Sequence, residues 1–304
     1  MSFKRDGNNA EKKRLNLSET QNIFPKFFEQ YYILLIETPD FRNCFFTHVS
    51  RPVRRKTGQY YGTSYMIMFF FLKRQFMDSK FWHECWENKN LGFNQKSFNL
   101  FLKNFFPELS LDSNASILVP LCGKSIDLLW LLKQGYQVTG VELSPLAIKE
   151  FFEEHKIPFT KGTIGPYTSW QAVDKKLLLL EGNFFELSSL SQKEFKESHL
   201  QTLSAIYDRA SLVALPKAMR IDYYNTLKKL LPPSTSLFLI TVEYDQSKVD
   251  GPPFSVPEQE IREFLGESFA IKIRHSETQK SVSPRFLSQG VTSLTSKIYQ
   301  LKKL

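Results

Sequence analysis

The clearest pattern of apolar and polar positions lies near the middle of the chain. Ser116–Pro120 is a short apolar run that predicts a strand ending at a polar turn. Ser125–Gln134 is almost continuously apolar and predicts a helix, with Gly135 placed to cap its C-terminus. A second apolar run, Gln137–Val141, leads directly into Glu142. This order of strand, turn, helix, strand and carboxylate is typical of the first half of a nucleotide-binding α/β sheet.

The turn after the first strand narrows the choice of nucleotide. Backbone N–H groups and a helix N-terminus would meet there, beside a carboxylate able to accept both hydroxyls of a ribose. A dinucleotide enzyme needs Gly-x-Gly-x-x-Gly so that its backbone can approach the pyrophosphate. Here the turn offers only Gly123, with Lys124 beside it. A nucleoside without a pyrophosphate, such as S-adenosylmethionine, tolerates this turn more easily, so the sequence favours a methyltransferase over a dehydrogenase.

Strands and helices alternate through the rest of the predicted domain. Further strands are predicted at Leu177–Leu180, Leu203–Tyr207, Ser236–Val242, Phe269–Arg274 and Ser293–Leu301, the last two as antiparallel partners. The predicted helices are Asp78–Asn88, Ser97–Phe106, Ser144–His155, Pro216–Leu230 and Glu258–Leu265, and Ser188–His199 is either a helix or a surface insertion. This alternation predicts a mostly parallel sheet of seven strands with helices on both faces, the Rossmann-like fold of class I S-adenosylmethionine-dependent methyltransferases.

Polar residues follow several of the predicted strands: Glu142, Asn183, Asp208, Arg209 and Glu243. Ligands in open α/β sheets bind at the carboxyl ends of the strands, so a site there would need such residues. Each also has an ordinary structural interpretation. A carboxylate can cap the next helix, an asparagine can sit in a turn, and Asp208 can pair with Arg209.

The basic character of the chain is concentrated at its N-terminal end. The formal net charge is +9, from 40 Lys and Arg against 31 Asp and Glu. Residues 1–76 hold 13 of the basic residues and 6 of the acidic ones, so residues 77–304 are close to neutral. The predicted domain therefore has no electrostatic footprint for nucleic acid, and we expect no nucleic-acid partner.

Residues 1–76 show no apolar period that holds for long, and three interpretations stay open. The segment can be an accessory part packed on the domain, or a basic arm for membrane or nucleic acid. It can also be sequence upstream of the true start, with Met77 as the first residue, because organised sequence begins there. We favour the last interpretation. We expect residues 1–76 to be a poorly ordered extension and residues 77–304 to be the methyltransferase domain.

Cysteine, histidine and hydropathy patterns argue against several other classes. The three cysteines form no Cys-x-x-Cys pair, which argues against a disulfide framework or structural zinc and suits a reducing cytosol. The five histidines show no metal-ligand spacing, so no metal is expected. The longest apolar stretch, Tyr65–Leu72, is shorter than the roughly 20 residues that span a bilayer. We expect a cytoplasmic monomer with no membrane partner.

Seven short motifs, taken in order along the chain, resemble one known family. They are Phe81 to Trp86, Gly92 to Gln95, Val119 to Ser125, Gly140 to Ser144, Tyr207 to Ala210, Glu243 to Gln246 and Gly251 to Phe254. Together they resemble the thiopurine S-methyltransferase family in its bacterial form, from about Met77 to the C-terminus. The resemblance implies S-adenosylmethionine as the methyl donor and a thiol or thiopurine as the acceptor, on the seven-stranded fold.

The resemblance also implies which residues bind the donor. Trp86 should cover its methionine part, and Leu121 should line the turn beneath it. Glu142 should hold the ribose hydroxyls. Asn183 and Phe184 should flank the adenine, although the family usually has an acidic residue at the first of these positions.

The implied acceptor site lies beside the donor. Arg209 should sit between donor and acceptor, Phe93 should contact the acceptor, and Arg285 resembles an arginine near the family's acceptor site. Asn94 stands where the family usually has histidine, which puts the acceptor's identity in question. No catalytic residue is assigned, because a thiopurine sulfur is already acidic and needs little base catalysis.

Two alternatives remain open from the sequence. The acceptor can be a selenium or tellurium species or a halide, since soft aromatic pockets suit polarisable atoms. The domain can also be a non-catalytic nucleoside-binding module that its basic N-terminal segment anchors to membrane or nucleic acid.

Overall fold

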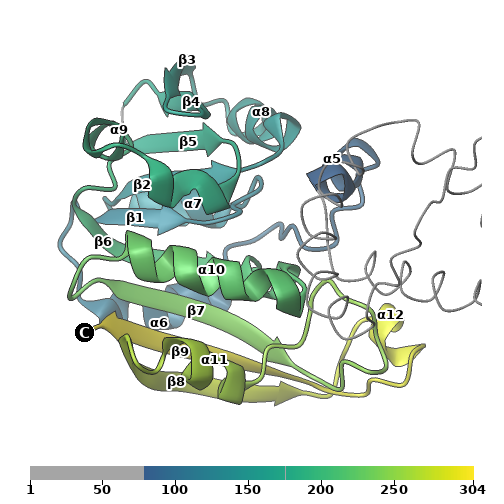
Figure 1. The fold of residues 1–304 in the computed structure, drawn as a ribbon. Helices are drawn as coiled ribbons and strands as arrows, with labels where there is room; N and C mark the ends of the chain where they lie inside the picture. Colours follow the sequence, from purple (N-terminus) through teal and green to yellow (C-terminus); the bar gives the residue numbers. More distant parts are fainter. Residues whose placement is uncertain (1–78, 175) are drawn as a thin grey trace, which may run out of the picture. The chain divides into compact units, whose positions relative to one another are not determined.

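A computed structural model of the chain describes residues 79–174 and 176–304 (Figure 1). The expectations for residues 1–76, for Met77 as the first residue and for Asp78 as the start of the first predicted helix lie outside the described residues. None of the helices in the described ranges has the length and hydropathy needed to cross a membrane.

Five parallel strands form the centre of the sheet in the described residues. They are β1 (Ser116–Val119), β2 (Gln137–Glu142), β5 (Leu177–Glu181), β6 (Leu203–Arg209) and β7 (Ser236–Glu243). Two long strands, β8 (Phe269–Gln279) and β9 (Leu294–Lys303), form an antiparallel pair that extends the sheet beyond β7. Because β9 lies between β7 and β8, the order is β5-β2-β1-β6-β7-β9-β8. The mostly parallel arrangement and the late antiparallel pair are therefore confirmed.

The sheet contains two strands that the sequence did not predict. β3 (Phe159–Ile164) and β4 (Tyr167–Ala172) form a hairpin, and β4 pairs antiparallel with β5. The full order over the described residues is β3-β4-β5-β2-β1-β6-β7-β9-β8, so the sheet has nine strands rather than seven. Ile164 is the one buried residue of β3. The strand thus lacks the apolar alternation on which a sequence-based prediction depends.

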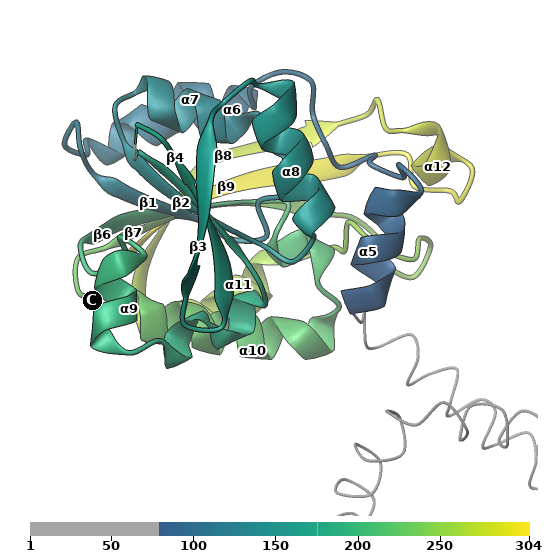
Figure 2. The same ribbon diagram turned by 90° about the horizontal axis from the view of Figure 1, so that it is seen from above.

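Helices cover both faces of the sheet, as Figure 2 shows. One face carries α6 (Leu100–Phe105), α7 (Asp127–Lys133) and α8 (Pro145–Glu154). The other carries α9 (Gln192–Glu197), α10 (Lys217–Leu230) and α11 (Glu258–Leu265). Two further helices, α5 (Ser79–Glu87) and α12 (Pro284–Leu287), lie on the side where the parallel strands end (Figures 1 and 2).

Alternate residues of β1 supply the two cores on either side of the sheet. Ile117 and Val119 belong to the core that contains Leu128 of α7, whereas Leu118 belongs to the core that contains Tyr223 of α10. This division follows from the pleat, because successive side chains of a strand point to opposite faces. Burying one large apolar side chain stabilises the folded state by about 1.5–3 kcal/mol. The two cores together therefore hold the central strands in place, and with them the residues at the strand ends.

Capping residues set the ends of helices near those strands. Ser144 accepts a hydrogen bond from the N–H of Ala147 at the start of α8. Gly135, with φ +95°, follows α7 as the sequence predicted. Ser191 and Glu194 form a capping box at the start of α9, so the segment 188–199 contains a helix.

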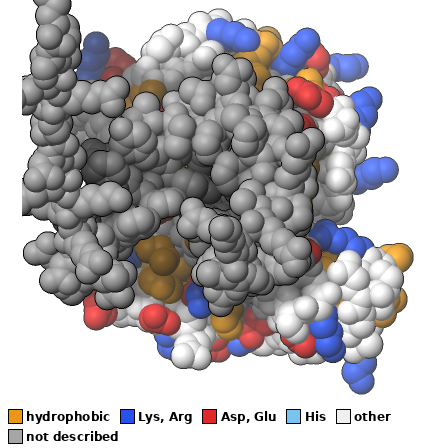
Figure 3. Space-filling model, turned by 45° about the vertical axis from the view of Figure 1, so that its right-hand side comes forward, with side chains coloured by type: hydrophobic (Ala, Val, Ile, Leu, Met, Phe, Trp, Pro, Cys, Tyr) orange, Lys and Arg blue, Asp and Glu red, His pale blue; other side chains and the backbone are white. Residues whose placement is uncertain are grey.

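The coloured part of the face in Figure 3 shows lysine and arginine side chains interspersed with aspartate and glutamate. This distribution agrees with the near balance of charge counted over residues 77–304.

Candidate functional site

The turn that follows β1, residues Pro120–Lys124, lies across the end of β2. The N–H of Cys122 donates to the carbonyl of Val141 at 3.0 Å, which ties the turn to the neighbouring strand. Leu121 and Gly123 have φ of 43° and 54°, in the left-handed region that favours glycine. We call this segment the β1 turn.

Glu142, the last residue of β2, is 6% exposed and faces the β1 turn. One carboxylate oxygen accepts from the N–H of Gly123 and the other from the N–H of Ser144, each at 2.8 Å. Burial raises the pKa of Glu142, and these N–H donors act in the opposite direction. A carboxylate offers about four acceptor positions, so it can still accept two hydroxyls beside these bonds.

An aromatic group lies against the β1 turn. Trp86 of α5 is 3% exposed, and its Cζ2 atom would lie 3.0 Å from a Cβ built on Gly123. The ring of Phe93 packs edge-on against Trp86, with centroids 5.5 Å apart, and against Trp82 at 5.8 Å. Edge-to-face pairs of this kind are worth about 0.5–1.5 kcal/mol each. The segment after α5 is thereby held over the turn.

Arg209, the last residue of β6, reaches this aromatic group. Its Nη2 donates to the carbonyl of Phe93 at 3.3 Å. Among the described residues, its guanidinium contacts this carbonyl and no carboxylate. The pair with Asp208, which is the structural alternative for both residues, does not form, because the Asp208 carboxylate accepts from Tyr223 Oη at 2.7 Å and from Leu212 N–H at 3.3 Å.

These contacts bring the expected donor and acceptor residues together. Glu142 contacts Gly123, Gly123 lies against Trp86, Trp86 packs on Phe93, and Phe93 accepts from Arg209. The contacts join four segments far apart in the sequence. The arrangement combines a buried carboxylate, an aromatic wall and a guanidinium without a counter-ion among the described residues.

The two remaining expected residues, Leu121 and Arg285, lie apart from each other. Leu121 is half-buried within the β1 turn and packs on the core beneath it. Arg285 lies on α12, is exposed, and donates to the carbonyls of Asp250 and Pro252. No contact joins Arg285 to the other expected residues in the described part of the chain.

The residues expected beside the adenine have structural partners. Asn183 is exposed and caps the 3-10 helix at Phe184–Ser189 by accepting from the N–H of Phe185. Phe184 is buried against Tyr223, with ring centroids 5.1 Å apart. Their contact with the adenine stays a prediction.

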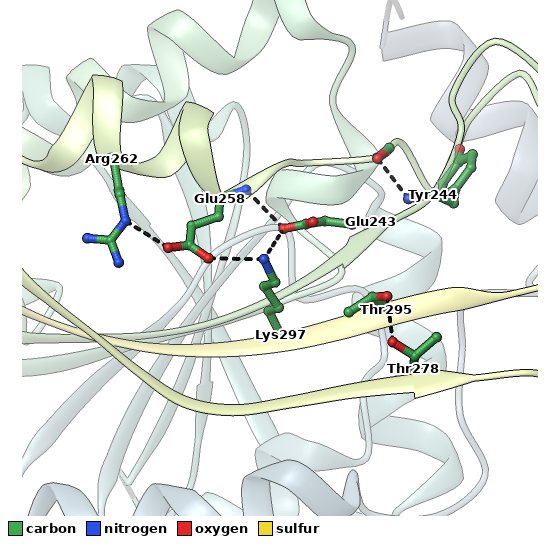
Figure 4. A network of polar contacts seen from close by, with 8 residues as sticks. Glu243, Tyr244, Glu258, Arg262, Thr278, Thr295 and Lys297 are labelled. Carbon is green, nitrogen blue, oxygen red and sulfur yellow. Dashed lines mark hydrogen bonds and ion pairs between the residues drawn. The ribbon is translucent and has the colours of Figure 1, made fainter.

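Two charged residues of the sequence motifs are engaged elsewhere. Lys124 pairs with Glu150 at 2.7 Å and Glu154 at 2.6 Å, both on α8. Glu243 accepts from Lys297 at 2.9 Å and from the N–H of Glu258 at 2.9 Å (Figure 4). These contacts give Lys124 and Glu243 a structural role in the fold.

A cavity of about 400 Å³ lies beside the network of Figure 4. Its walls come from Glu243, Tyr244 and the segment 290–295 among others, and none of its lining residues belongs to the β1 turn. The cavity is therefore separate from the residues that we expect to bind the donor and the acceptor. No group of three or more potential metal ligands occurs within the described ranges.

Ser211 contributes to the site without any signal in the sequence. Its buried hydroxyl donates to the carbonyl of Pro120 at 2.7 Å and so ties the segment after Arg209 to the β1 turn. Ala210, with φ 66°, makes the bend that places Ser211 there. A serine after a strand is too common for its spacing to reveal such a contact.

Comparison with known proteins adds an independent line of evidence. A family model described as thiopurine S-methyltransferase matches residues 77–304. The chain is similar to the thiopurine S-methyltransferase of Pseudomonas entomophila strain L48, at 38% identity over 227 residues that cover 75% of this chain and 100% of that protein. For the thiopurine S-methyltransferase of Shewanella baltica strain OS155 the identity is 35% over 227 residues, with the same coverage. A solved methyltransferase structure from Anabaena variabilis is similar with a TM-score of 0.48 at 13% identity, covering 76% of this chain and 97% of that one.

Proposed function

We propose that this chain, which belongs to the thiopurine S-methyltransferase family of S-adenosylmethionine-dependent enzymes, moves a methyl group to the sulfur of a thiopurine or another small thiol. Membership in that family decides against the alternative of a non-catalytic nucleoside-binding module. The observation that carries the proposal is the continuous series of contacts from Glu142 to Arg209.

The residues around the β1 turn fit S-adenosylmethionine. Glu142 is buried, held by two N–H donors and still able to accept the two ribose hydroxyls. Gly123 has no side chain, which lets the indole of Trp86 pack closely against the turn, and Leu121 lines that turn. Trp86 suits a sulfonium because the face of an indole ring attracts cations.

The acceptor would lie between the donor, Phe93 and Arg209. When bound, S-adenosylmethionine supplies an electrophilic methyl group on a sulfonium that departs as a neutral thioether. Arg209 is placed to favour the anionic form of the acceptor sulfur, because a nearby positive charge lowers the pKa of a thiol. A thiolate gives neutral products directly, and a thiol releases its proton.

Positioning would supply most of the rate enhancement. Holding two reactants in line can contribute about 7–11 kcal/mol, and this transfer needs no covalent intermediate on the protein. The aromatic wall of Trp86 and Phe93 excludes water from the reacting groups. We assign no general base.

The test measures release of S-adenosylhomocysteine with a panel of acceptors that includes 6-mercaptopurine, thiophenol, a selenol and iodide. Methylation of the two sulfur compounds is the expected result, with a lower rate in Glu142→Gln when S-adenosylmethionine is limiting. Methylation of the selenol or iodide without methylation of either sulfur compound would contradict the proposed acceptor class.

A further inference from the structure

The loop Asp250–Phe254 between β7 and α11, which we call the proline loop, contacts the segment that follows Arg209. The N–H of Phe254 donates to the carbonyl of Val213 at 2.6 Å. Val213 belongs to the 3-10 helix Leu212–Ala214, which begins three residues after Arg209. The proline loop is therefore joined to the segment that directly follows Arg209, the residue proposed to face the acceptor.

The backbone of this loop has few N–H groups with which to form its own hydrogen bonds. Pro252 and Pro253 have no N–H, so they cannot donate to a neighbouring strand or turn, and their carbonyls need donors from elsewhere. Two side chains provide them. Tyr244 donates its hydroxyl to the carbonyl of Pro253 at 2.6 Å, and Arg285 donates Nη1 to the carbonyl of Pro252 at 2.8 Å and Nη2 to that of Asp250.

The two side chains that donate these hydrogen bonds, Tyr244 and Arg285, lie beside a small separate hydrophobic core. Phe286, next to Arg285 on α12, is buried with Val249 and Val291. The ring of Tyr244 packs edge-on against Phe286, with centroids 5.1 Å apart. This core fixes the base of both side chains, while their polar ends reach the proline loop.

The geometry suits an arginine better than a lysine, because two N–H groups of one side chain donate to two carbonyls. A guanidinium presents its N–H groups in a rigid planar fork, which matches two carbonyls at fixed separation. A lysine ammonium is a single point donor on a flexible stem and cannot hold both carbonyls in the same way.

We propose that Arg285 is a positioning residue that holds the proline loop, together with Tyr244, as a preformed wall of the acceptor site. It does so through the carbonyls of Asp250 and Pro252 rather than by contact with the acceptor. The proposal rests on the proposed function for the location of the acceptor, but the hydrogen bonds that it invokes are independent of the substrate.

The first experiment follows hydrogen exchange of the amides of Gly251, Phe254 and Ser255 in the full-length protein without substrate. Arg285→Lys and Tyr244→Phe should each speed exchange at Phe254 about tenfold, because exchange reports local opening. Arg262→Lys is the matched control, since Arg262 forms an exposed pair with Glu258 on α11 at 2.8 Å. Unchanged exchange in both loop variants would overturn the proposal.

The second experiment separates positioning from direct contact. Kinetics are measured with thiosalicylate, which carries a carboxylate, and with thiophenol, which does not. For Arg285→Lys and Tyr244→Phe, the acceptor KM should rise by the same factor, about tenfold, with both thiols, while the KM for S-adenosylmethionine and the melting temperature match those of Arg262→Lys. A loss confined to thiosalicylate in the Arg285 variant would show direct contact and overturn the proposal.

The two experiments can fail separately. A wild-type protein that methylates neither thiol would contradict the proposed function. The exchange measurement would still decide whether Arg285 and Tyr244 hold the proline loop.

Discussion

The indole of Trp86 occupies the space into which a side chain at Gly123 would project. A Cβ on Gly123 would lie 3.0 Å from Cζ2 and 3.4 Å from Cη2 of the indole. The φ of Gly123 is +54°, where an L-residue is strained. One glycine thus serves both the conformation of the β1 turn and the close packing of α5 over it.

Gly123→Ala should therefore weaken donor binding. We expect the Kd for S-adenosylhomocysteine to rise about tenfold and the free energy of unfolding to fall by about 1–2 kcal/mol, the cost of a left-handed alanine. Titration calorimetry and urea unfolding measure the two effects. Gly135→Ala is the control, because Gly135 has φ +95° after α7 and should lose stability without a change in Kd. Equal Kd values for wild type and Gly123→Ala would contradict the placement of the donor.

Glu142→Gln should weaken donor binding by about 10–100-fold. One amide oxygen replaces two carboxylate acceptors, and its NH₂ group would face the N–H of Gly123 or Ser144. Glu181→Gln is the matched control, since Glu181 ends the neighbouring strand and accepts from Trp170 instead. A Kd equally altered in both variants would count against the ribose assignment.

The same carboxylate predicts a pH dependence of donor binding. Burial raises the pKa of Glu142, so its ionised form is lost at a higher pH than for an ordinary glutamate. Because the ionised form accepts the hydroxyls, wild-type affinity should decline as the pH falls through that raised pKa. The Kd of Glu142→Gln should stay level over the same range, and a parallel decline in both proteins would assign the effect to another group.

Arg209→Gln should lower kcat with 6-mercaptopurine by about 10–100-fold, because the acceptor sulfur loses the positive charge beside it. Steady-state kinetics at saturating donor measure the loss. Arg262→Gln removes an exposed arginine on α11 and should leave kcat unchanged. Wild-type turnover in Arg209→Gln would remove this residue from the site.

The central strand, turn and helix could be predicted because their apolar runs are long and end at clear breaks. The carboxylate at Glu142 followed from its place at a strand end. The hairpin β3-β4 could not be predicted, because β3 is mostly exposed and buries no apolar face. It covers the ring of Trp170 with a lysine instead, since Nζ of Lys161 lies 3.4 Å from the ring centroid.

Partners distant in the sequence also limited prediction. Lys124 finds its carboxylates on α8, and Arg285 finds carbonyls more than 30 residues away. Neither contact leaves a local signal. The failure of Asp208 and Arg209 to pair was open to physical reasoning, since adjacent residues of a strand point to opposite faces.

Asp208 should make the stability of the fold depend on pH. It is fully buried, and burial raises its pKa to about 6. An unfolded aspartate titrates near 3.9, so between about pH 4 and 6 the folded chain binds the proton more tightly. The free energy of unfolding should therefore fall by up to about 3 kcal/mol as the pH rises through this window, and stay level above it.

Asp208→Asn tests this slope, because the amide can still accept from Leu212 N–H and bond with Tyr223 Oη. Urea unfolding from pH 4 to 7.5 should show a flatter profile for this variant. Asp222→Asn, which changes an exposed aspartate on α10, should keep the wild-type slope. The same slope in all three proteins would assign the pH dependence to other groups.

We propose that residues 77–304 carry the complete donor site, because the matching relatives are covered over 100% of their length by this part of the chain. A version of the protein starting at Met77 should bind S-adenosylhomocysteine with a Kd within about twofold of the full chain. A version starting at Ser97 lacks Trp86 and Phe93 and should lose binding while keeping the two cores beside β1. Calorimetric titration of the full chain and of the two shorter versions with S-adenosylhomocysteine measures the three Kd values. Loss of binding in the version starting at Met77 would make residues 1–76 part of the donor site.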